Sequence, residues 1–455
     1  MVEIHANGGF LPKISLKNCQ ILENKLDSCL SCSYNEPEDY SNLAILRESR
    51  RFAASNMEQQ ALSHRVLSLS ESQTIGMSKL SRELSSKGVD VINLSLGEPD
   101  FVTPVHIRTA AKKAIDDGFT FYPPIAGFAE LRKAVSEKFK RENNLDYKPD
   151  QVIVSTGAKQ SIANVVLSII DEGDEVIIPM PYWVSYIEIV KLAGGKTVSV
   201  NTTIKDDFKM TPAQLEAAIT PKTKMFIFSS PCNPTGTVYT KDELKALADV
   251  LVKHPRIIIM SDEIYEHINF QGGHQSIAQF DFIKDQVVIV NGVSKGYAMT
   301  GWRIGYIGAP KYIAEACDKM QGQFTSAASS IAQKAAEAAL TESNAPTLEM
   351  QAAFLRRRNL VLGLMKDIPG WIINEPKGAF YVFPDISYYF GKKDGESVIQ
   401  NSTDLCMYLL HKGHVSLVTG EAFGAPNCLR FSYAASDEKL VEAIKRIKIA
   451  LANLK

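Results

Sequence analysis

The amino-acid sequence predicts an α/β fold with a large domain, built on a mostly parallel seven-stranded sheet covered by helices, and a smaller α+β domain. Between residues 151 and 309, short apolar runs alternate with helical patterns. Continuous apolar strands that alternate with helices are typical of a parallel sheet buried on both faces. After Pro310 the chain is first helical, then rich in strands, and closes with a helix from Ser436, which indicates a second domain.

By these patterns the chain divides into four segments. Residues 1–57 show little sustained periodicity, and we predict a disordered extension there. We expect residues 58–104 to contribute to the small domain, 105–340 to form the large domain and 341–455 to complete the small one. The seven predicted strands of the large domain are, in chain order, QVIVST, DEVIIP, TVSV, KMFIFSS, RIIIMSDEIY, VVIVNGVSK and RIGYIGA.

Helical patterns flank and separate these strands. One pattern, TPVHIRTAAKKAIDDG, begins at a capping threonine, and a second, GFAELRKAVSEKFKRE, follows it ahead of the first strand. Further along, the helical stretch LEMQAAFLRRRNLVLGLMKD carries three consecutive arginines, residues 356–358. Because charged residues usually occupy the solvent side of a helix, we expect these arginines on a solvated face.

Composition and charge narrow the classes of function. The chain is 45% hydrophobic and 22% charged, as is usual for a globular protein. No apolar run approaches the roughly 20 residues that a bilayer span requires. Its 50 basic and 51 acidic residues give a net charge of -1, so we expect neither nucleic acid nor a membrane surface as a partner. Small molecules or another protein chain are the expected partners.

Seven cysteines in 455 residues do not suggest a disulfide scaffold, which favours a reducing, cytoplasmic compartment. Cys29 and Cys32 form a C-x-x-C pair, but no second pair with metal-ligand spacing follows, so we predict no metal site. The first 57 residues resemble neither a secretory signal nor a transit peptide. Met57, which opens the patterned sequence, is an alternative start of the chain.

Polar groups directly follow several predicted strands, at the sheet edge where such folds bind ligands. Gly157, Ala158 and Lys159 open a helix, and free backbone N–H groups at a helix N-terminus form an anion seat. Glycine at such a turn is also common for steric reasons alone. Asn233 lies in SPCNPTG, a turn that two prolines make rigid, and a structural Asx turn explains it equally well.

Asp262, Tyr265 and Lys295 follow two later strands. Singly, Asp262 is explained as a turn or cap residue, and Lys295 can simply reach solvent. A lysine in an apolar, electropositive setting, however, becomes a nucleophile able to form a Schiff base with an aldehyde. Arg303 would supply the positive neighbour and a bidentate phosphate clamp. A lysine, an acid and a phosphate seat together match the needs of pyridoxal phosphate (PLP).

Seven motifs occur along the chain in a fixed order: NLSLGEPDF, YPPIAGFAELRKA, PYWVSY, NPTG, SDEIY, SKGYAMTGWRIGY and LRFSYA. From about Leu62 to the C-terminus, the sequence therefore resembles the class I aminotransferases of PLP fold type I. Within them it is most similar to the 1-beta subgroup of aspartate aminotransferases, some of which also use prephenate. The resemblance implies a PLP-dependent homodimer with shared active sites that exchanges an amino group between an amino acid, expected to be aspartate, and 2-oxoglutarate.

The resemblance also implies a role for each motif residue. Lys295 would bind the cofactor aldehyde and move the substrate α-proton, Asp262 would pair with the ring nitrogen and Tyr265 would bond the phenolate oxygen; these are the expected catalytic residues. The other expected cofactor-binding residues are Gly157, Ala158, Lys159, Trp183, Asn233, Ser294, Arg303 and, from a second subunit, Tyr122. The expected substrate-binding residues are Gly97, Trp183, Asn233 and Arg430.

Two positions depart from the family pattern. Gly292 stands where many class I enzymes carry a phosphate-binding serine, so one hydroxyl contact is missing or is supplied by the backbone. Ser70 falls where members active on prephenate tend to have a basic residue, so we expect prephenate to be a poor substrate. The alternatives are an aminotransferase for aromatic amino acids or kynurenine, a PLP β-lyase and, more remotely, a transcription regulator with an aminotransferase-like domain.

Overall fold

The computed structural model describes residues 61–71 and 73–455. The chain divides into two compact units, Met1–Leu67 and Ser68–Lys455, and the short helix α3 (His64–Leu67) belongs to the first. The predicted disordered extension, the Cys29–Cys32 pair and Met57 lie outside the described residues. Among the described residues, no helix is both long and apolar enough to cross a bilayer.

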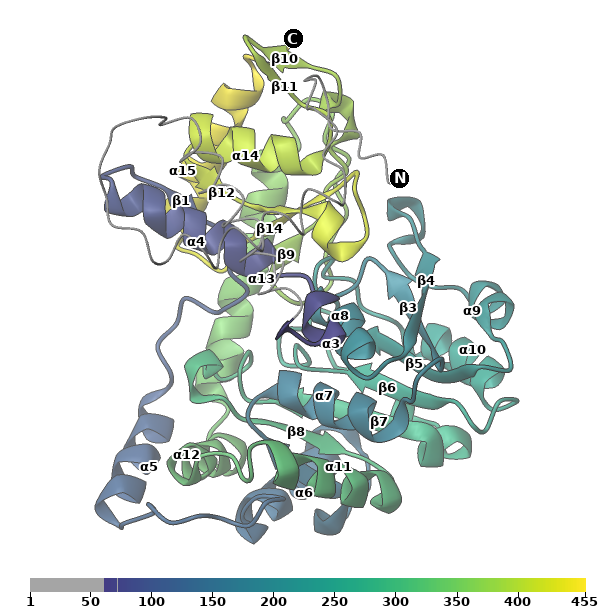
Figure 1. Cartoon of the computed structure of the whole chain (residues 1–455). Helices are drawn as coiled ribbons and strands as arrows, with labels where there is room; N and C mark the ends of the chain where they lie inside the picture. The colour runs from purple at the N-terminus through teal and green to yellow at the C-terminus, as the bar shows by residue number, and fades with distance from the viewer. Residues whose placement is uncertain (1–60, 72) are drawn as a thin grey trace, which may run out of the picture. The chain divides into compact units, whose positions relative to one another are not determined.

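The predicted seven-stranded, mostly parallel sheet is confirmed (Figure 1). Only β8 runs against its two neighbours, β2 and β7, while the remaining neighbours pair in parallel. In spatial order the strands are β2 (Val152–Ser155), β8 (Gly305–Gly308), β7 (Val287–Gly292), β6 (Ile258–Asp262), β5 (Thr223–Ser229), β3 (Glu175–Met180) and β4 (Lys196–Asn201).

Different helices cover the two faces of this sheet. On β5, Phe226 and Phe228 point to one face, and Met225 and Ile227 point to the other. Both sets are apolar because the strand is buried on both sides, which explains the continuous apolar runs in the sequence. The first face is covered by α5 (Val105–Asp116), α6 (Ala129–Asn143), α9 (Pro212–Ala218), α10 (Lys241–Leu251) and α12 (Ser330–Thr341); the second by α7 (Ala158–Ile169), α8 (Ser185–Leu192) and α11 (Lys311–Phe324).

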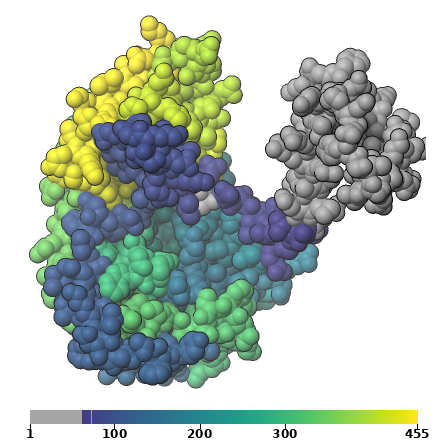
Figure 2. Space-filling model, turned by 60° about the vertical axis from the view of Figure 1, so that its left-hand side comes forward, coloured from purple at the N-terminus to yellow at the C-terminus, as the bar shows by residue number. Residues whose placement is uncertain are grey.

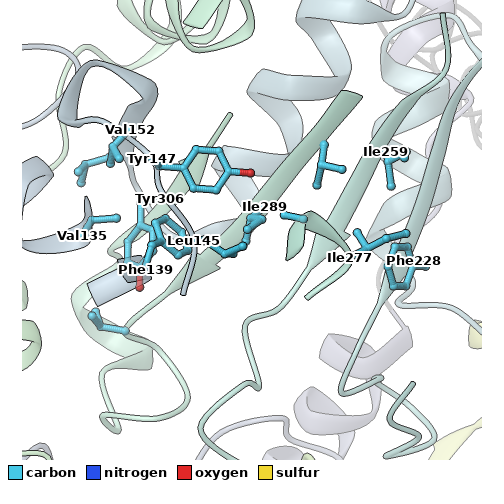
Figure 3. Packing of buried hydrophobic residues seen from close by; sticks show 14 of the residues in the cluster. Val135, Phe139, Leu145, Tyr147, Val152, Phe228, Ile259, Ile277, Ile289 and Tyr306 are labelled. Carbon is cyan, nitrogen blue, oxygen red and sulfur yellow. The ribbon is translucent and has the colours of Figure 1, made fainter. Parts of the chain in front are cut away.

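Aromatic side chains fill the core under α6. Figure 3 shows Phe139, Tyr147 and Tyr306 grouped together, and Tyr306 belongs to β8. The ring centroid of Phe139 lies 5.4 Å from that of Tyr147 and 5.9 Å from that of Tyr306, distances at which aromatic pairs attract. This cluster holds α6 against the sheet and so fixes the position of Lys138, the buried charged residue of this helix.

A second hydrophobic core packs the first residues of the second unit, near residues 77–94, against its C-terminal helices and strands. Met77 and Ile92 pack with residues of the C-terminal helices and strands, and Figure 2 shows this early segment against the yellow C-terminal residues. The domain boundaries themselves stay predictions. The elements of this core are α4 (Gln73–Ser86), β1 (Ile92–Asn93), α13 (Ala345–Met365), β9 (Tyr381–Val382), α14 (Ser402–Lys412), β12 (Val415–Ser416), β14 (Leu429–Ser432) and α15 (Asp437–Leu451).

Two small sheets shape this core. Strand β1 pairs in parallel with β12, and β13 (Val418–Thr419), β14 and β9 form an antiparallel sheet in that order. The short antiparallel pair β10 (Lys393–Asp394) and β11 (Ser397–Val398) lies between β9 and α14 in the chain.

The expectation that residues 356–358 face solvent holds for Arg356, whose side chain is 61% exposed, but is wrong for Arg358, which is 12% exposed, and most clearly for Arg357. Its side chain is only 8% exposed, and its guanidinium donates to both carboxylate oxygens of Asp100, at 2.7 and 3.0 Å. It also stacks over the rings of Phe101 and Phe354. A charged group can be buried when it is paired and hydrogen-bonded in this way. The pair ties α13 to the segment that carries Gly97.

Charged residues are also buried beneath the large sheet. Lys138 of α6 is fully buried, and its ammonium forms a very short contact with the Glu266 carboxylate and donates to Asn143 Oδ1 at 2.9 Å. Burial alone would raise the pKa of Glu266, but the nearby Lys138 and His267 charges outweigh it, and the pKa lies well below its usual range. Glu266 therefore depends on Lys138 as its counter-ion.

Candidate active site

A cavity of about 250 Å³ lies at the carboxyl ends of the sheet strands. This is the edge at which parallel sheets bind ligands. Of the thirteen residues predicted for the site, eleven line it: Gly97, Ala158, Lys159, Trp183, Asn233, Asp262, Tyr265, Ser294, Lys295, Arg303 and Arg430. Gly157 does not line the cavity but lies against the Arg303 guanidinium. Tyr122 is exposed and does not line the cavity.

Lys295 presents an amine to this cavity, three residues after β7 ends. Its ammonium donates to the Gly97 carbonyl oxygen and lies 5.6 Å from the centre of the Tyr265 ring. Burial is the largest cause that lowers the pKa of Lys295, and the positive charges of Arg430 and Arg303 lower it further. The resulting pKa is about 8. A substantial fraction of this amine is therefore neutral, and able to accept a proton, just above neutral pH.

Asp262 is the last residue of β6 and is buried in the cavity wall. Its Oδ2 accepts a 2.6 Å hydrogen bond from the Tyr186 hydroxyl, and its Oδ1 accepts one from the Ile264 N–H at 3.2 Å. Burial raises the pKa of Asp262 to about 6, although both hydrogen bonds favour the charged form. An ionised carboxylate in this wall would stabilise a protonated ring nitrogen opposite it.

Arg430 of β14 is a buried cation with unused donor capacity. Its Nη1 donates to Asn233 Oδ1 at 2.9 Å and its Nη2 donates to the Ser95 carbonyl at 2.6 Å. Its Nε is buried without a partner. A guanidinium in this state suits a carboxylate, because the planar fork of donors matches two carboxylate oxygens.

A second anion seat lies where α7 begins. Gly157 (φ +83°) precedes the helix, and a Cβ there would lie 2.2 Å from Arg303 Nη2. A Cβ on Gly305 would likewise lie 2.2 Å from the Ala158 nitrogen. Only glycine at both positions lets the guanidinium approach the free N–H groups of the helix N-terminus. Ser294, which is buried, also lines the cavity and carries a hydroxyl.

The departure at Gly292 has a steric cause. Gly292 pairs with Gly305 of β8, and a Cβ at position 292 would lie 2.8 Å from the Ile304 carbonyl oxygen and 2.9 Å from the Gly305 Cα. Backbone atoms cannot yield to that contact as a flexible side chain could. A serine is therefore disfavoured at this position in this chain.

Tyr122 is the one predicted residue that the structure does not bring to the cavity. Its side chain is 97% exposed, and its neighbour Phe121 is 85% exposed. Within the described chain, Tyr122 is therefore a surface residue and not part of the cavity wall.

Sequence reasoning missed Tyr186 and Tyr381, which also line the cavity. Tyr186 lies three residues after Trp183, about one helical turn, and their rings pack edge to face at 5.4 Å. Because residues three apart on a helix lie on the same face, the spacing from Trp183 could have predicted that Tyr186 also faces the cavity. Tyr381 gave none, because GAFYVF looks like an ordinary buried strand.

The chain belongs to the class I and II aminotransferases, a family that it matches over residues 89–447. Members of this family depend on PLP.

The bifunctional aspartate aminotransferase and glutamate/aspartate-prephenate aminotransferase of Petunia hybrida is 48% identical, with 87% of this chain and 84% of that protein covered. The aspartate aminotransferase of Bacillus subtilis is 46% identical, with 85% and 98% covered. The crystal structure of the Rhizobium meliloti aspartate aminotransferase superposes with a TM-score of 0.84 at 41% identity, covering 87% of this chain and 99% of that one. The resemblance inferred from the motifs is thus confirmed.

Proposed function

We propose that this chain is a PLP-dependent aminotransferase that moves an amino group between aspartate and 2-oxoglutarate. The observation that carries the proposal is one cavity in which a buried amine (Lys295), a buried acid (Asp262) and a guanidinium with a free donor (Arg430) converge. The relatives named as aspartate aminotransferases support the choice of substrate.

The residues present fit the cofactor. PLP supplies an aldehyde and a ring that accepts electrons. The glycine-lined seat beside Arg303 suits its phosphate, since a Cβ at position 157 would collide with the Arg303 guanidinium and push it away from the helix N-terminus. The residues that would hold the cofactor are Gly157, Ala158, Lys159, Ser294 and Arg303 at the phosphate, Asp262 at the ring nitrogen, Tyr265 and Asn233 at the phenolate oxygen, and Trp183 against the ring.

Lys295 would act as the acid and base of the reaction. Its lowered pKa, about 8, leaves it neutral for part of the time near neutral pH, so that it can accept the substrate α-proton and return it. Arg430, with Asn233 and the Gly97 backbone, would hold the substrate α-carboxylate and so orient the Cα–H bond toward the amine.

Arg430 cannot select among amino acids, because every one carries an α-carboxylate. A second cation is needed for the side-chain carboxylate of aspartate. Lys159 lines the cavity, and its ammonium lies 5.0 Å from the centre of the Trp183 ring. We infer that its backbone N–H serves the phosphate seat while its ammonium faces the second carboxylate.

Aspartate and glutamate should be better donors to 2-oxoglutarate than phenylalanine or kynurenine, measured as kcat/KM over a panel of donors. Lys159→Met should lower kcat/KM for aspartate by about 10- to 100-fold, the equivalent of one charge-assisted hydrogen bond. Phenylalanine provides the internal control, since it has no second carboxylate to lose. Equal use of phenylalanine by the wild type would reject the aspartate assignment, and release of free ammonia would indicate a lyase.

Prephenate should be a poor acceptor, about 10- to 100-fold below oxaloacetate in kcat/KM, because no cation stands at position 70. The Ser70 backbone N–H donates to the Glu188 carboxylate at 2.9 Å, so the charge beside this residue is negative. Ser70→Lys should raise prephenate activity more than oxaloacetate activity. Ser86→Lys, at the end of α4, is the matched control. Comparable wild-type rates with both acceptors would mean that another residue supplies the charge.

We further propose a homodimer in which Tyr122 enters the partner's site. Mixing Tyr122→Ala chains with Lys295→Ala chains, each inactive alone, should restore about a quarter of the sites, because half of the dimers are hybrids with one intact site of two. Mixing Lys295→Ala with Asp262→Ala is the control, since both residues serve the same chain's cavity and no intact site can form. Hybrids without recovered activity would contradict the shared site.

A further inference from the structure

Tyr381 occupies a junction between the two cores. It lies on β9, whose residues 381 and 382 pair with Ser432 and Phe431 of β14, the strand that carries Arg430. Its side chain is fully buried from solvent, yet it lines the cavity. It therefore contacts the proposed substrate clamp and the wall of the large sheet at once.

The ring of Tyr381 lies against Arg430. The guanidinium carbon is 4.5 Å from the centre of this ring and 5.1 Å from that of Phe423, so two aromatic rings enclose the cation. Guanidinium groups are attracted to aromatic faces, which limits the orientations of the guanidinium plane. The ring thus helps to fix the direction in which the unpartnered Nε of Arg430 can donate.

The hydroxyl of Tyr381 has a different neighbour. Its oxygen is 2.6 Å from that of Tyr265, close enough for a hydrogen bond in which either group can donate. A Cβ on Gly97 would lie 2.5 Å from this hydroxyl, so Tyr381 also occupies the space that a larger residue at position 97 would need. The Gly97 carbonyl in turn accepts from Lys295.

The direction of the hydrogen bond between Tyr381 and Tyr265 follows from the proposed role of Tyr265 as a donor to the cofactor. A phenol has one proton to donate. If Tyr265 donates to an anionic oxygen of the cofactor, it can only accept from Tyr381, and a phenol that accepts a hydrogen bond becomes a stronger donor itself. Tyr381 would then strengthen the hydrogen bond from Tyr265 to that oxygen without contacting the cofactor itself.

We propose that Tyr381 is a positioning residue with two separable tasks: its ring orients Arg430 for the substrate carboxylate, and its hydroxyl directs the Tyr265 proton toward the cofactor. This inference rests on the proposed function. The other charged groups that face Tyr265 are Arg430, Asp262 and Lys295, and the variants below leave all three in place.

Two variants separate the tasks in the cofactor-loaded enzyme. Tyr381→Phe removes only the hydroxyl and should move the pH at which the visible absorbance of the bound cofactor changes upward by roughly 0.5 to 1 unit. Its affinity for maleate, an unreactive dicarboxylate, should stay within about twofold. Tyr381→Met also removes the ring and should weaken maleate binding by about 5- to 30-fold, the contribution of a buried cation–π contact.

Tyr433→Phe is the matched control, because Tyr433 is fully buried nearby and its hydroxyl donates to the Ala379 carbonyl rather than to a cavity residue. It should change neither the absorbance titration nor maleate binding. An unshifted titration in Tyr381→Phe would overturn the hydroxyl task, and an equal loss of maleate affinity in the Phe and Met variants would overturn the ring task. A wild type that gains no visible absorbance with PLP would instead refute the proposed function.

Discussion

Replacing Lys295 with alanine should abolish aminotransferase turnover while the protein still binds PLP. The variant loses the amine that the cavity places against both the Gly97 carbonyl and the Tyr265 ring. General acid–base catalysis alone typically contributes about 10²- to 10⁴-fold, and the lost covalent anchoring of the cofactor adds to that. We therefore expect kcat to fall by at least about 10⁴-fold. The seat beside Arg303 and the Asp262 carboxylate remain, so cofactor binding should persist.

Two measurements test this result. Turnover is followed with aspartate and 2-oxoglutarate, and PLP binding is followed by equilibrium dialysis on the same preparation. Lys245→Ala, which removes an exposed lysine paired with Asp249 on α10, is the matched control and should keep full activity. A Lys295→Ala variant with more than about 1% of wild-type kcat would remove Lys295 from the reaction. Loss of both activity and PLP binding would show that the lysine mainly holds the cofactor.

Replacing Lys138 with methionine should destabilise the fold by about 3 to 5 kcal/mol, the usual effect of removing one partner of a buried ion pair. Glu266 would then lie buried without its principal counter-ion. Lys133→Met is the matched control on the same helix. Its ammonium is 3.7 Å from the Glu137 carboxylate and 70% exposed, and such surface pairs contribute about 0 to 1 kcal/mol. Urea unfolding of the three proteins gives the comparison.

The pH dependence of this loss provides a second test. In the wild type the depressed pKa of Glu266 contributes stability above the pKa of the unfolded carboxyl, and that contribution is lost as the pH falls. Without Lys138, burial should raise this pKa, so the variant gains from protonation and its deficit should be smaller at pH 5 than at pH 8. A deficit that is equal at both pH values would indicate a packing defect. Glu266→Gln added to Lys138→Met should recover part of the stability.

The sheet and most of the site could be predicted because they depend on local patterns. The apolar runs reveal the strands, since a strand buried on both faces must be apolar throughout. The polar residues that follow those runs, such as Asp262 and Lys295, then meet at one edge because parallel strands end together. Nine of the eleven predicted residues that line the cavity follow or end these strands, whereas Gly97 and Arg430 come from the second core and were predicted only through the family resemblance.

Contacts between distant segments could not be predicted in the same way. Arg357 looks like a solvated residue in the sequence because its partner, Asp100, is 257 positions away. Tyr381 looks like an ordinary strand residue because its functional neighbours, Tyr265 and Arg430, come from two other segments. The steric need for glycine at position 292 likewise depends on strand β8, which pairs against the direction of the others. Pairings of this kind are a property of the fold as a whole.

The pairing of β1 with β12 sets the order in which the chain can fold during its synthesis. Asn93 pairs with Ser416, so the ribosome must add 323 further residues before the second partner exists. At about 5 to 20 residues per second, β1 and the following Gly97 segment wait roughly 16 to 65 s without their partner. The large sheet is complete by Gly308, well before that time. A nascent chain can therefore hold a folded sheet with an unfinished cavity, which makes the exposed early segment a natural client for chaperones.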